Sequence, residues 1–356
     1  MRTLPPITRR QITRRAALGL LGAAALPFGA VRAAPETGAI TQELIDAAKK
    51  EGKVVWYTSV ELGLGEKVGK AFEEKFGIPV QVERSGAERV FQRIGQEYSS
   101  NIHACDAVNS SDASHLIVWK KQGLLAPWVP EDVAKHYPAQ YQDKDGMFAT
   151  WRIMLSPIGY NTKLVKPEEA PKSFADLLDP KWKGKLVKAH PGYSGTIATT
   201  TFEMARDLGW DYMAKLAQQR VMQVQSATEP PKKIAQGERA VSVDGGDYVL
   251  QMLKDQGAPV DMVYPSEGTP LITGPTGIFK DAPHPNAARL FSSWCFGVEC
   301  QQMVIDVGAL RSAHPGIKER PDRPPLAQIK LMKDDPEGVE QQIEQIKAKY
   351  TSYFKT

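Results

Sequence analysis

The fold is decided by a strand-to-helix turn with the sequence His190-Pro-Gly-Tyr-Ser-Gly-Thr196. The apolar residues of Lys185-Leu-Val-Lys188 predict a strand before it, and Pro191-Gly192 predicts the turn itself. A helix is expected to follow through Ile197–Arg206, with a hydroxyl residue as its N-cap. The stretch therefore predicts one strand-turn-helix unit of an α/β fold.

The start of this helix is a candidate anion site. The first N–H groups of a helix have no partner within the helix, so they attract negative charge, and small residues let a ligand approach them. The candidate ligand-binding residues of this turn are Tyr193, Ser194, Gly195 and Thr196. An ordinary helix cap without a ligand is the alternative interpretation of the same residues.

Three further strand-to-helix units precede this one. Apolar strands are expected at 54–57, 80–82 and 106–108, and helices at 65–76, 87–98 and 113–122. A small hydroxyl residue follows each strand: Ser59, Ser85 and Ser110. Ligands of open parallel sheets bind beyond the carboxyl ends of the strands, so these serines are candidates to line one shared site, and ordinary helix caps are the alternative.

A second candidate loop follows the strand predicted at 240–243. In its sequence, Asp244-Gly-Gly-Asp-Tyr248, two glycines let the backbone approach a ligand closely. Asp244, Asp247 and Tyr248 are candidate ligand-binding residues there, and Tyr57 and Tyr160 offer further phenol groups. The long extended runs at 148–160 and 271–279 are expected to cross between two domains.

The N-terminus is predicted to be an export signal. Its Thr13-Arg-Arg-Ala-Ala-Leu18 begins an uncharged apolar run that ends in small residues, with cleavage expected near Ala33-Ala34, as in twin-arginine signals. The apolar run is too short to predict a membrane span. An anchored N-terminal helix is the alternative.

Composition and charge limit the classes of function. The chain has 356 residues, of which 42% are hydrophobic and 24% charged, and this is enough for two globular domains. The first 34 residues contain six arginines and no acidic residue, which leaves 39 basic residues against 41 acidic ones. The basic character therefore belongs to the N-terminus, and nothing indicates nucleic acid or an anionic membrane as a partner.

The three cysteines, Cys105, Cys295 and Cys300, are expected to be small buried hydrophobic residues. Cys295 and Cys300 lie five residues apart on a predicted helix, so they are expected on different faces and poorly placed to form a disulfide. Because no CxxC, HExxH or paired Cys/His spacing occurs, a structural zinc site is not expected.

Several segments resemble the periplasmic solute-binding proteins of ATP-driven importers, of the family 1 type that includes ferric-iron binders. The segments that carry the resemblance are Val54–Ser59, Tyr160–Thr162, Asp179–Lys185, Gly237-Glu238, Glu267–Pro270, Asn286–Phe291 and Glu299–Gln302. It extends over the whole chain after the signal. The resemblance implies a type II periplasmic binding fold, with two α/β lobes, parallel-type sheets flanked by helices, and a ligand cleft between the lobes.

The resemblance also implies a domain organisation. We expect the export signal at 1–34, the first part of lobe 1 at 35–152, lobe 2 at 153–270, a return to lobe 1 at 271–310, and a C-terminal helical segment at 311–356 that packs on lobe 2. The implied protein is a periplasmic monomer that closes its two lobes on a small anionic solute or ferric iron. It would deliver this cargo to an ABC permease in the inner membrane and would need no cofactor.

The nature of the ligand stays open between ferric iron and an organic anion. Ferric binders of this family place two adjacent tyrosines where this chain has Asp247-Tyr248, so Tyr248 and Asp247 are candidate metal ligands only if ferric iron is the cargo. The helix starts near Ser110 and Ser194 instead suit a carboxylate, a phosphate or a phosphonate. Arg84 and Arg89 are candidates to add positive charge, and solvated surface arginines are the alternative interpretation.

Two other functions are weighed against transport. A protein of this kind can present its ligand to a sensor kinase instead. An exported enzyme is the rival class, and Asp244, Asp247 and His190 are its candidate acid-base groups. The chain has no GxSxG elbow, no GxGxxG after a strand and no P-loop, so it is predicted not to be an enzyme.

Overall fold

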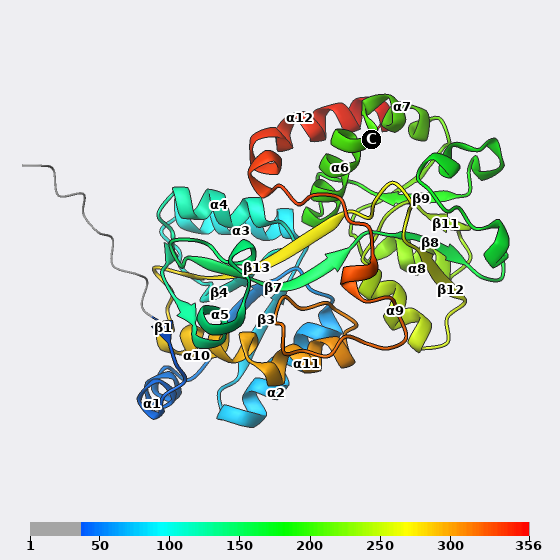
Figure 1. Ribbon diagram of the computed structural model, residues 1–356. Helices are drawn as coiled ribbons and strands as arrows, with labels where there is room; N and C mark the ends of the chain where they lie inside the picture. The colour runs from blue at the N-terminus through cyan, green and yellow to red at the C-terminus, as the bar shows by residue number, and fades with distance from the viewer. Residues whose placement is uncertain (1–36, 356) are drawn as a thin grey trace, which may run out of the picture. The chain divides into compact units, whose positions relative to one another are not determined.

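The computed structural model describes residues 37–355, so the predicted export signal lies outside the described residues. Strands and helices alternate over residues 37–121 and again over 222–263 (Figure 1). The strands are β1 (Thr37–Gly38), β2 (Val54–Thr58), β3 (Val80–Arg84), β4 (Ala107–Asn109), β5 (Leu125–Ala126), β6 (Val129–Pro130), β7 (Phe148–Leu155), β8 (Ile158–Asn161), β9 (Leu186–Ala189), β10 (Met222–Val224), β11 (Val241–Ser242), β12 (Val260–Val263) and β13 (Leu271–Phe279). The α-helices are α1 (Gln42–Glu51), α2 (Leu62–Phe76), α3 (Ala87–Ser99), α4 (Ala113–Lys121), α5 (Glu131–His136), α6 (Gly195–Leu208), α7 (Trp210–Ala217), α8 (Glu229–Ala235), α9 (Asp247–Asp255), α10 (Pro285–Phe296), α11 (Val298–Asp306) and α12 (Pro336–Phe354). Within residues 37–355, no helix is both long enough and apolar enough to span a membrane.

The first large sheet, the sheet of lobe 1, has the strand order β3-β2-β4-β13-β5, and β7 pairs with β13. Strands β3, β2 and β4 are parallel, whereas β13 runs antiparallel to its neighbours. The central strand β2 is buried along its whole length because helices cover both faces. Val54 and Trp56 pack towards α2 and α10, and Val55 and Tyr57 pack towards α3 and α4.

The second large sheet, the sheet of lobe 2, has the strand order β10-β9-β11-β8-β12. Strands β10, β9 and β11 are parallel, and β8 and β12 are antiparallel. Leu186 of β9 packs with α6 and α7, whereas Val187 packs with α8 and α9. Both sheets therefore have a parallel core of three strands, flanked by antiparallel strands and covered by helices.

Strands β7 and β13 run side by side and connect the two sheets (Figure 1). The chain leaves lobe 1 through β7, bends at Ser156-Pro157, and enters the lobe 2 sheet as β8. The extended run expected at 148–160 is therefore two strands, since proline has no N–H for a continuing ladder. The chain returns to lobe 1 through β13, and we call β7 and β13 the hinge strands.

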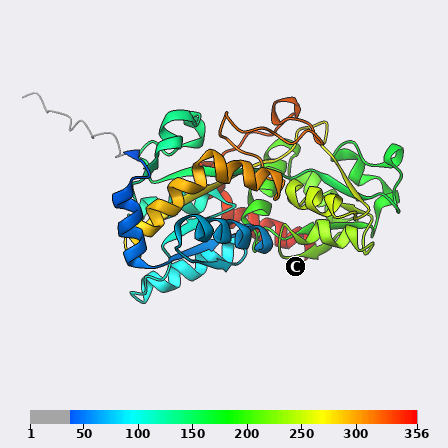
Figure 2. The ribbon, with the colours of Figure 1, turned by 90° about the horizontal axis from the view of Figure 1, so that it is seen from below.

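Figure 2 shows α1, α2, α10 and α11 together on one face of lobe 1. The break between α10 and α11 at Gly297 affects two of the cysteines, all three of which are free and buried. Burial, and then a hydrogen-bonding contact with the Cys300 thiol, raise the pKa of Cys295. The expectation that Cys295 and Cys300 lie on different faces of one helix is wrong, because the helix ends between them.

Candidate functional site

The carboxyl ends of β2 and β4 meet, as their parallel pairing requires. The N–H of Ser111 donates to Ser59 Oγ at 2.9 Å, and the N–H of Ser59 donates to the Asn109 carbonyl at 3.2 Å. Ser110 Oγ lies 3.0 Å from Nδ1 of His115. These contacts fix the loops at the end of the lobe 1 sheet.

A buried arginine lies beside Ser59. Arg152, on hinge strand β7, is 0% exposed. Its Nε donates to Asn109 Oδ1 at 2.9 Å, and its terminal nitrogens donate to Ser59 Oγ at 3.0 Å and to the Met154 sulfur at 3.2 Å. All three partners are neutral, so none of them cancels the positive charge of the guanidinium.

The other hinge strand leaves room for this arginine through Gly274. A Cβ atom at Gly274 would lie 2.7 Å from Cγ of Arg152 and 3.0 Å from its Nε. The ladder between the hinge strands shifts register between Gly274 and Pro275, as at a β-bulge. Only glycine fits this close approach, so Gly274 sets the position of the guanidinium.

Tyr248 and Arg84 complete the group around Arg152. Tyr248, in the first turn of α9, lies close enough to Arg152 to interact with its charge. Burial raises the pKa of Tyr248, and the positive charges of Arg152 and Arg84 partly oppose this shift. Arg84 donates to the Val60 carbonyl at 3.1 Å, and its NH2 lies 3.5 Å from Ser226 Oγ of lobe 2. Groups from both lobes therefore surround the guanidinium.

The charge of Arg152 has no counter-ion within residues 37–355. Burial lowers its pKa to about 10, Tyr248 raises it, and the positive charge of Arg84 lowers it further. A buried cation without a partner is costly, and the cost is removed when an opposite charge binds beside it. The geometry thus fits a negatively charged ligand between the lobes.

Arg152, Asn109 and Ser226 are not among the residues predicted from the sequence. Arg152 lies in an otherwise uncharged extended run, which indicates a buried strand but assigns no role to its one cation. A single arginine inside such a run is an informative pattern, because arginine is almost never fully buried unless it is paired.

The predicted turn at the start of α6 lies where the two lobes touch. Ser194 is the N-cap of α6, but its side chain makes no capping hydrogen bond. A Cβ atom at Gly195 would lie 2.5 Å from Cβ of Asp112 in lobe 1. Thr196 is buried and Tyr193 is 43% exposed. The start of α6 therefore faces the side chain of Asp112.

The predicted carboxylate Asp244 is neutralised within lobe 2. Its Oδ2 lies 2.6 Å from Nζ of Lys188, and both side chains are fully buried. Its Oδ1 accepts a hydrogen bond from the N–H of Ala189 at 3.1 Å. This ion pair lies beneath the turn that leads to α6.

The predicted carboxylate Asp247 is held by two arginines. Its Oδ2 accepts from Nε of Arg311 at 3.1 Å and from Arg323 at 3.4 Å, and its Oδ1 accepts from the N–H of Leu155 at 3.0 Å. Tyr248 instead contacts Arg152. The two candidate metal ligands thus have different partners, and the structure does not bring them together.

The remaining predicted residues lie at some remove from Arg152. The phenol of Tyr57 donates to Glu97 at 2.8 Å within the lobe 1 core. Tyr160 is buried in the lobe 2 core. Ser85 lies before α3, and its N–H donates to the Thr58 carbonyl at 3.1 Å. Of the twelve predicted residues, only Ser59 and Tyr248 have a described contact with Arg152.

Two clusters have the residue types of a metal site. In the cluster of Asp132, His136 and His314, the N–H of Gly316 donates to Nδ1 of His314 at 3.0 Å. Nε2 of His314 lies 3.5 Å from Asp132 Oδ1 and makes no hydrogen bond within the described residues.

The second cluster consists of Glu88, Asp112 and His115. The ammonium group of Lys347 already lies 2.9 Å from Glu88 Oε2, and Nε2 of His115 lies 3.1 Å from Glu88 Oε1. Glu88 therefore already has partners within the protein, whereas Asp112 Oδ2 and His314 Nε2 have no hydrogen-bond partner among the described residues.

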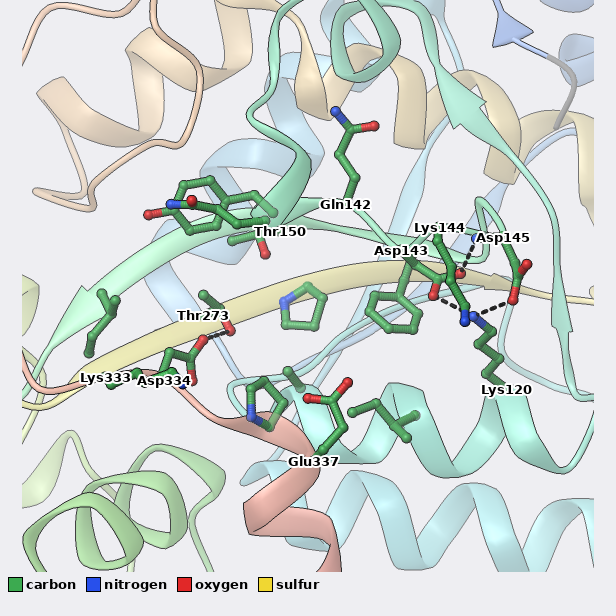
Figure 3. Close-up of a pocket in the computed structure, with 18 of the residues that line it drawn as sticks. Lys120, Gln142, Asp143, Lys144, Asp145, Thr150, Thr273, Lys333, Asp334 and Glu337 are labelled. Atoms are coloured by element: carbon green, nitrogen blue, oxygen red, sulfur yellow. Dashed lines mark hydrogen bonds and ion pairs between the residues drawn. The ribbon is translucent and has the colours of Figure 1, made fainter. Parts of the chain in front are cut away.

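A cavity of about 960 Å³ lies on the opposite face of the hinge strands (Figure 3). Thr273 of β13 lines it, whereas the neighbouring Gly274 faces Arg152. Thr273 donates to Asp334 at 2.8 Å at one end of the cavity, and Lys120 pairs with Asp143 at the other. The cavity is therefore separate from the group around Arg152.

The raised pKa of Asp334 predicts that the stability of the protein depends measurably on pH. Burial, and then the charge of Asp112, raise the pKa of Asp334 to about 6, although its hydrogen bond from Thr273 opposes the shift. The folded state therefore binds this proton more tightly than the unfolded state, so stability falls as pH rises from about 4 to about 6. Urea unfolding at pH 4 and pH 7 measures this loss of unfolding free energy. We expect the loss to be about 2 to 3 kcal/mol smaller in Asp334→Asn than in wild type. An unchanged difference between the two pH values would contradict the assignment.

A family model described as "Bacterial extracellular solute-binding protein" matches residues 112–329. An uncharacterized protein of Haemophilus influenzae is 26% identical over 273 residues, which are 74% of this chain and 78% of that protein. The "Probable ABC transporter periplasmic-binding protein y4fP" of Sinorhizobium fredii is 24% identical over 234 residues, which are 61% of this chain and 62% of that protein.

Solved structures of periplasmic binding proteins have the same fold. AfuA of Actinobacillus pleuropneumoniae, solved with fructose-6-phosphate bound, has a TM-score of 0.78 and 26% identity, covering 85% of this chain and 99% of AfuA. Iron-bound HitA of Pseudomonas aeruginosa has a TM-score of 0.72 and 20% identity, covering 84% of this chain and 99% of HitA. The two-lobed α/β fold predicted from the sequence is confirmed.

Proposed function

This chain belongs to the bacterial extracellular solute-binding protein family, and we propose that it captures a small organic anion in the periplasm for an ABC importer. The family and the type II fold are those of binding proteins, and the Sinorhizobium fredii relative is described as a probable ABC transporter periplasmic-binding protein. The protein would carry its ligand to a permease in the inner membrane, and no catalytic step is part of the proposal.

The buried charge of Arg152 is the observation that carries the choice of an anion. The guanidinium is fully buried at the boundary between the lobes, and all its hydrogen-bond partners are neutral. Arg84 adds a second positive charge nearby. A carboxylate or phosphate group would accept charge-assisted hydrogen bonds from these arginines, which are stronger than bonds between neutral groups.

Sugar phosphates are the first class to test, because AfuA was solved with fructose-6-phosphate. Ferric iron is the other candidate, since HitA was solved with iron. Two features disfavour iron here: Tyr248 lies between two arginines, and Asp247 is already held by Arg311. A positively charged surrounding repels a ferric ion, so we propose that Tyr248 contacts the anion as a neutral phenol.

We propose that ligand capture closes two lobes about the hinge strands. Lobe 1 would comprise 35–152 and 271–310, and lobe 2 would comprise 153–270 with the C-terminal segment 311–356 packed on it. A ligand that contacts Arg152 and Ser59 from lobe 1 and Tyr248 and Ser226 from lobe 2 binds the closed form better than the open form. The difference in affinity shifts the population towards closure.

Thermal unfolding of the ligand-free mature protein tests this function. The protein is refolded from denaturant and mixed with fructose 6-phosphate, glucose 6-phosphate, inorganic phosphate, citrate or ferric citrate. A ligand present at 100 times its dissociation constant adds about 2.7 kcal/mol of stability, and this raises the melting temperature by several degrees. We expect such a rise with an organic anion. A rise that requires iron, with a visible phenolate-to-iron absorption band, would replace the anion by iron.

A further inference from the structure

The C-terminal helix α12 makes its apolar contacts with lobe 2. Val339 and Ile346 pack against Phe202 of α6, and Tyr350 is buried in the lobe 2 core. The phenol of Tyr350 donates to Oε1 of Gln223 at 2.7 Å. The helix also runs alongside α4 of lobe 1, but its buried side chains pack into lobe 2, so we expect α12 to move with lobe 2.

Two charged side chains of α12, Glu340 and Lys347, reach lobe 1 instead. Nζ of Lys347 lies 2.9 Å from Glu88 Oε2 on α3, and the side chains are 23% and 4% exposed. Glu340 lies 2.9 Å from Lys121 on α4, in a pair whose lysine is 61% exposed. Breaking an exposed pair costs little, whereas removing the partner of a buried carboxylate costs more, so the loss of Lys347 is expected to have the larger effect.

Glu88 connects this link to the loop at the end of β4. Its Oε1 lies 3.1 Å from Nε2 of His115, and Nδ1 of His115 lies 3.0 Å from Ser110 Oγ. Ser110 Oγ accepts a hydrogen bond from the N–H of Asp112 at 3.1 Å. Asp112 in turn packs against Gly195 of lobe 2. A chain of hydrogen bonds therefore runs from α12 to the loop that meets the other lobe.

We propose that Lys347 is a positioning residue that holds the lobes closed around the ligand, acting through Glu88 and His115. The identity of the ligand in this proposal rests on the proposed function, whereas the contact between Lys347 and Glu88 does not depend on which ligand binds. Opening about the hinge strands separates Lys347 on lobe 2 from Glu88 on lobe 1. The pair therefore stabilises the closed form alone and slows release of the ligand.

Distances between the lobes test the proposal without any ligand. Spin labels are attached to exposed positions on each lobe, at Lys70→Cys in α2 and Lys166→Cys before the 3-10 helix Pro167–Glu169. Electron-spin distance measurements then compare the ligand-free protein with its Lys347→Met variant. We expect the variant to shift the distribution towards longer distances. An unchanged distribution would overturn the proposal.

Lys349→Met is the matched control, because it removes the same charge from the same helix. Nζ of Lys349 lies over the ring of Trp210 in lobe 2, 4.7 Å from its centroid, so it does not link the lobes. We expect this variant to keep the wild-type distances. Equal shifts in both variants would mean that the net charge of α12 sets the distance between the lobes, and that the contact with Glu88 does not.

Release of fructose 6-phosphate gives the second readout. Loss of a contact made only in the closed form is expected to raise the dissociation rate of Lys347→Met roughly tenfold, with an association rate close to that of wild type. An unchanged dissociation rate would overturn the proposal. If wild type does not bind fructose 6-phosphate, the proposed ligand class fails, and the distance measurement still decides the role of Lys347.

Discussion

Replacing Arg152 by methionine is expected to weaken ligand binding strongly without destabilising the ligand-free protein. Truncating one partner of a buried, hydrogen-bonded charge pair costs about 2 to 5 kcal/mol, so the affinity for the anion should fall by roughly 30-fold to more than 1,000-fold. Without ligand, the guanidinium is a buried charge with neutral partners only, so removing it leaves the melting temperature unchanged or higher. Isothermal titration and thermal unfolding measure the two effects.

Arg89→Met is the matched control for this variant. Arg89 is also on lobe 1 and also contacts lobe 2, through Gln225 at 2.6 Å, but its side chain is exposed. We expect its loss to change affinity by only a few-fold. Gly274→Ala perturbs the same site from hinge strand β13, because the Cβ of the alanine would displace the Arg152 side chain. If Arg152→Met melts at a much lower temperature and still binds its anion, the arginine is a structural residue only.

Replacing Asp247 by asparagine is expected to destabilise the protein strongly. The change leaves Arg311 and Arg323 without the carboxylate that they share, and both side chains are buried. Breaking a buried ion pair by removing one partner costs about 3 to 5 kcal/mol. Urea unfolding should record this loss, and the melting temperature should fall by several degrees.

Glu319→Gln provides the comparison for Asp247→Asn. Glu319 pairs with the same Arg311 at 3.0 Å, but its side chain is 41% exposed, so its loss is expected to cost less than about 1 kcal/mol. Equal small effects from both variants would show that Asp247 does not hold the buried arginines. If Asp247→Asn keeps full stability and loses ferric binding, Asp247 is a metal ligand after all.

The sequence predicts the architecture well because the pattern repeats. The strand at β2 and the helix at α1 are recognisable from short local rules: an apolar run, and Thr41 as a cap that accepts from the N–H of Leu44. The hinge strands are also recognisable from their length. The break at Ser156-Pro157 is less evident, since only pairing with the second sheet shows where β7 ends and β8 begins.

The candidate site is harder to predict because it depends on contacts between distant segments. Arg152 is positioned by Asn109 and by Gly274, which are 43 and 122 residues away in the sequence. A bulge in the hinge ladder also interrupts the simple alternation of faces along β7. No short motif contains this information, so the arginine is found only when the strands are placed side by side.

Neighbouring residues in the sequence can also have different roles. Asp247 and Tyr248 are adjacent, which suggests a shared metal site by analogy with paired tyrosines. Both lie on α9, however, where successive side chains are about 100° apart around the helix axis. Asp247 therefore reaches Arg311 while Tyr248 reaches Arg152. The hydroxyl group of Ser59 at a strand end, by contrast, lies where parallel pairing predicts.

Equilibrium dialysis tests the central claim most directly. The ligand-free mature protein is dialysed against a mixture of sugar phosphates, carboxylic acids and ferric citrate, and the retained molecules are identified by mass spectrometry and an iron assay. We expect wild type to retain an organic anion and no iron, and Arg152→Met to retain neither. Retention of iron by both proteins, or of an uncharged sugar by wild type, would contradict the claim that the buried guanidinium binds an anion.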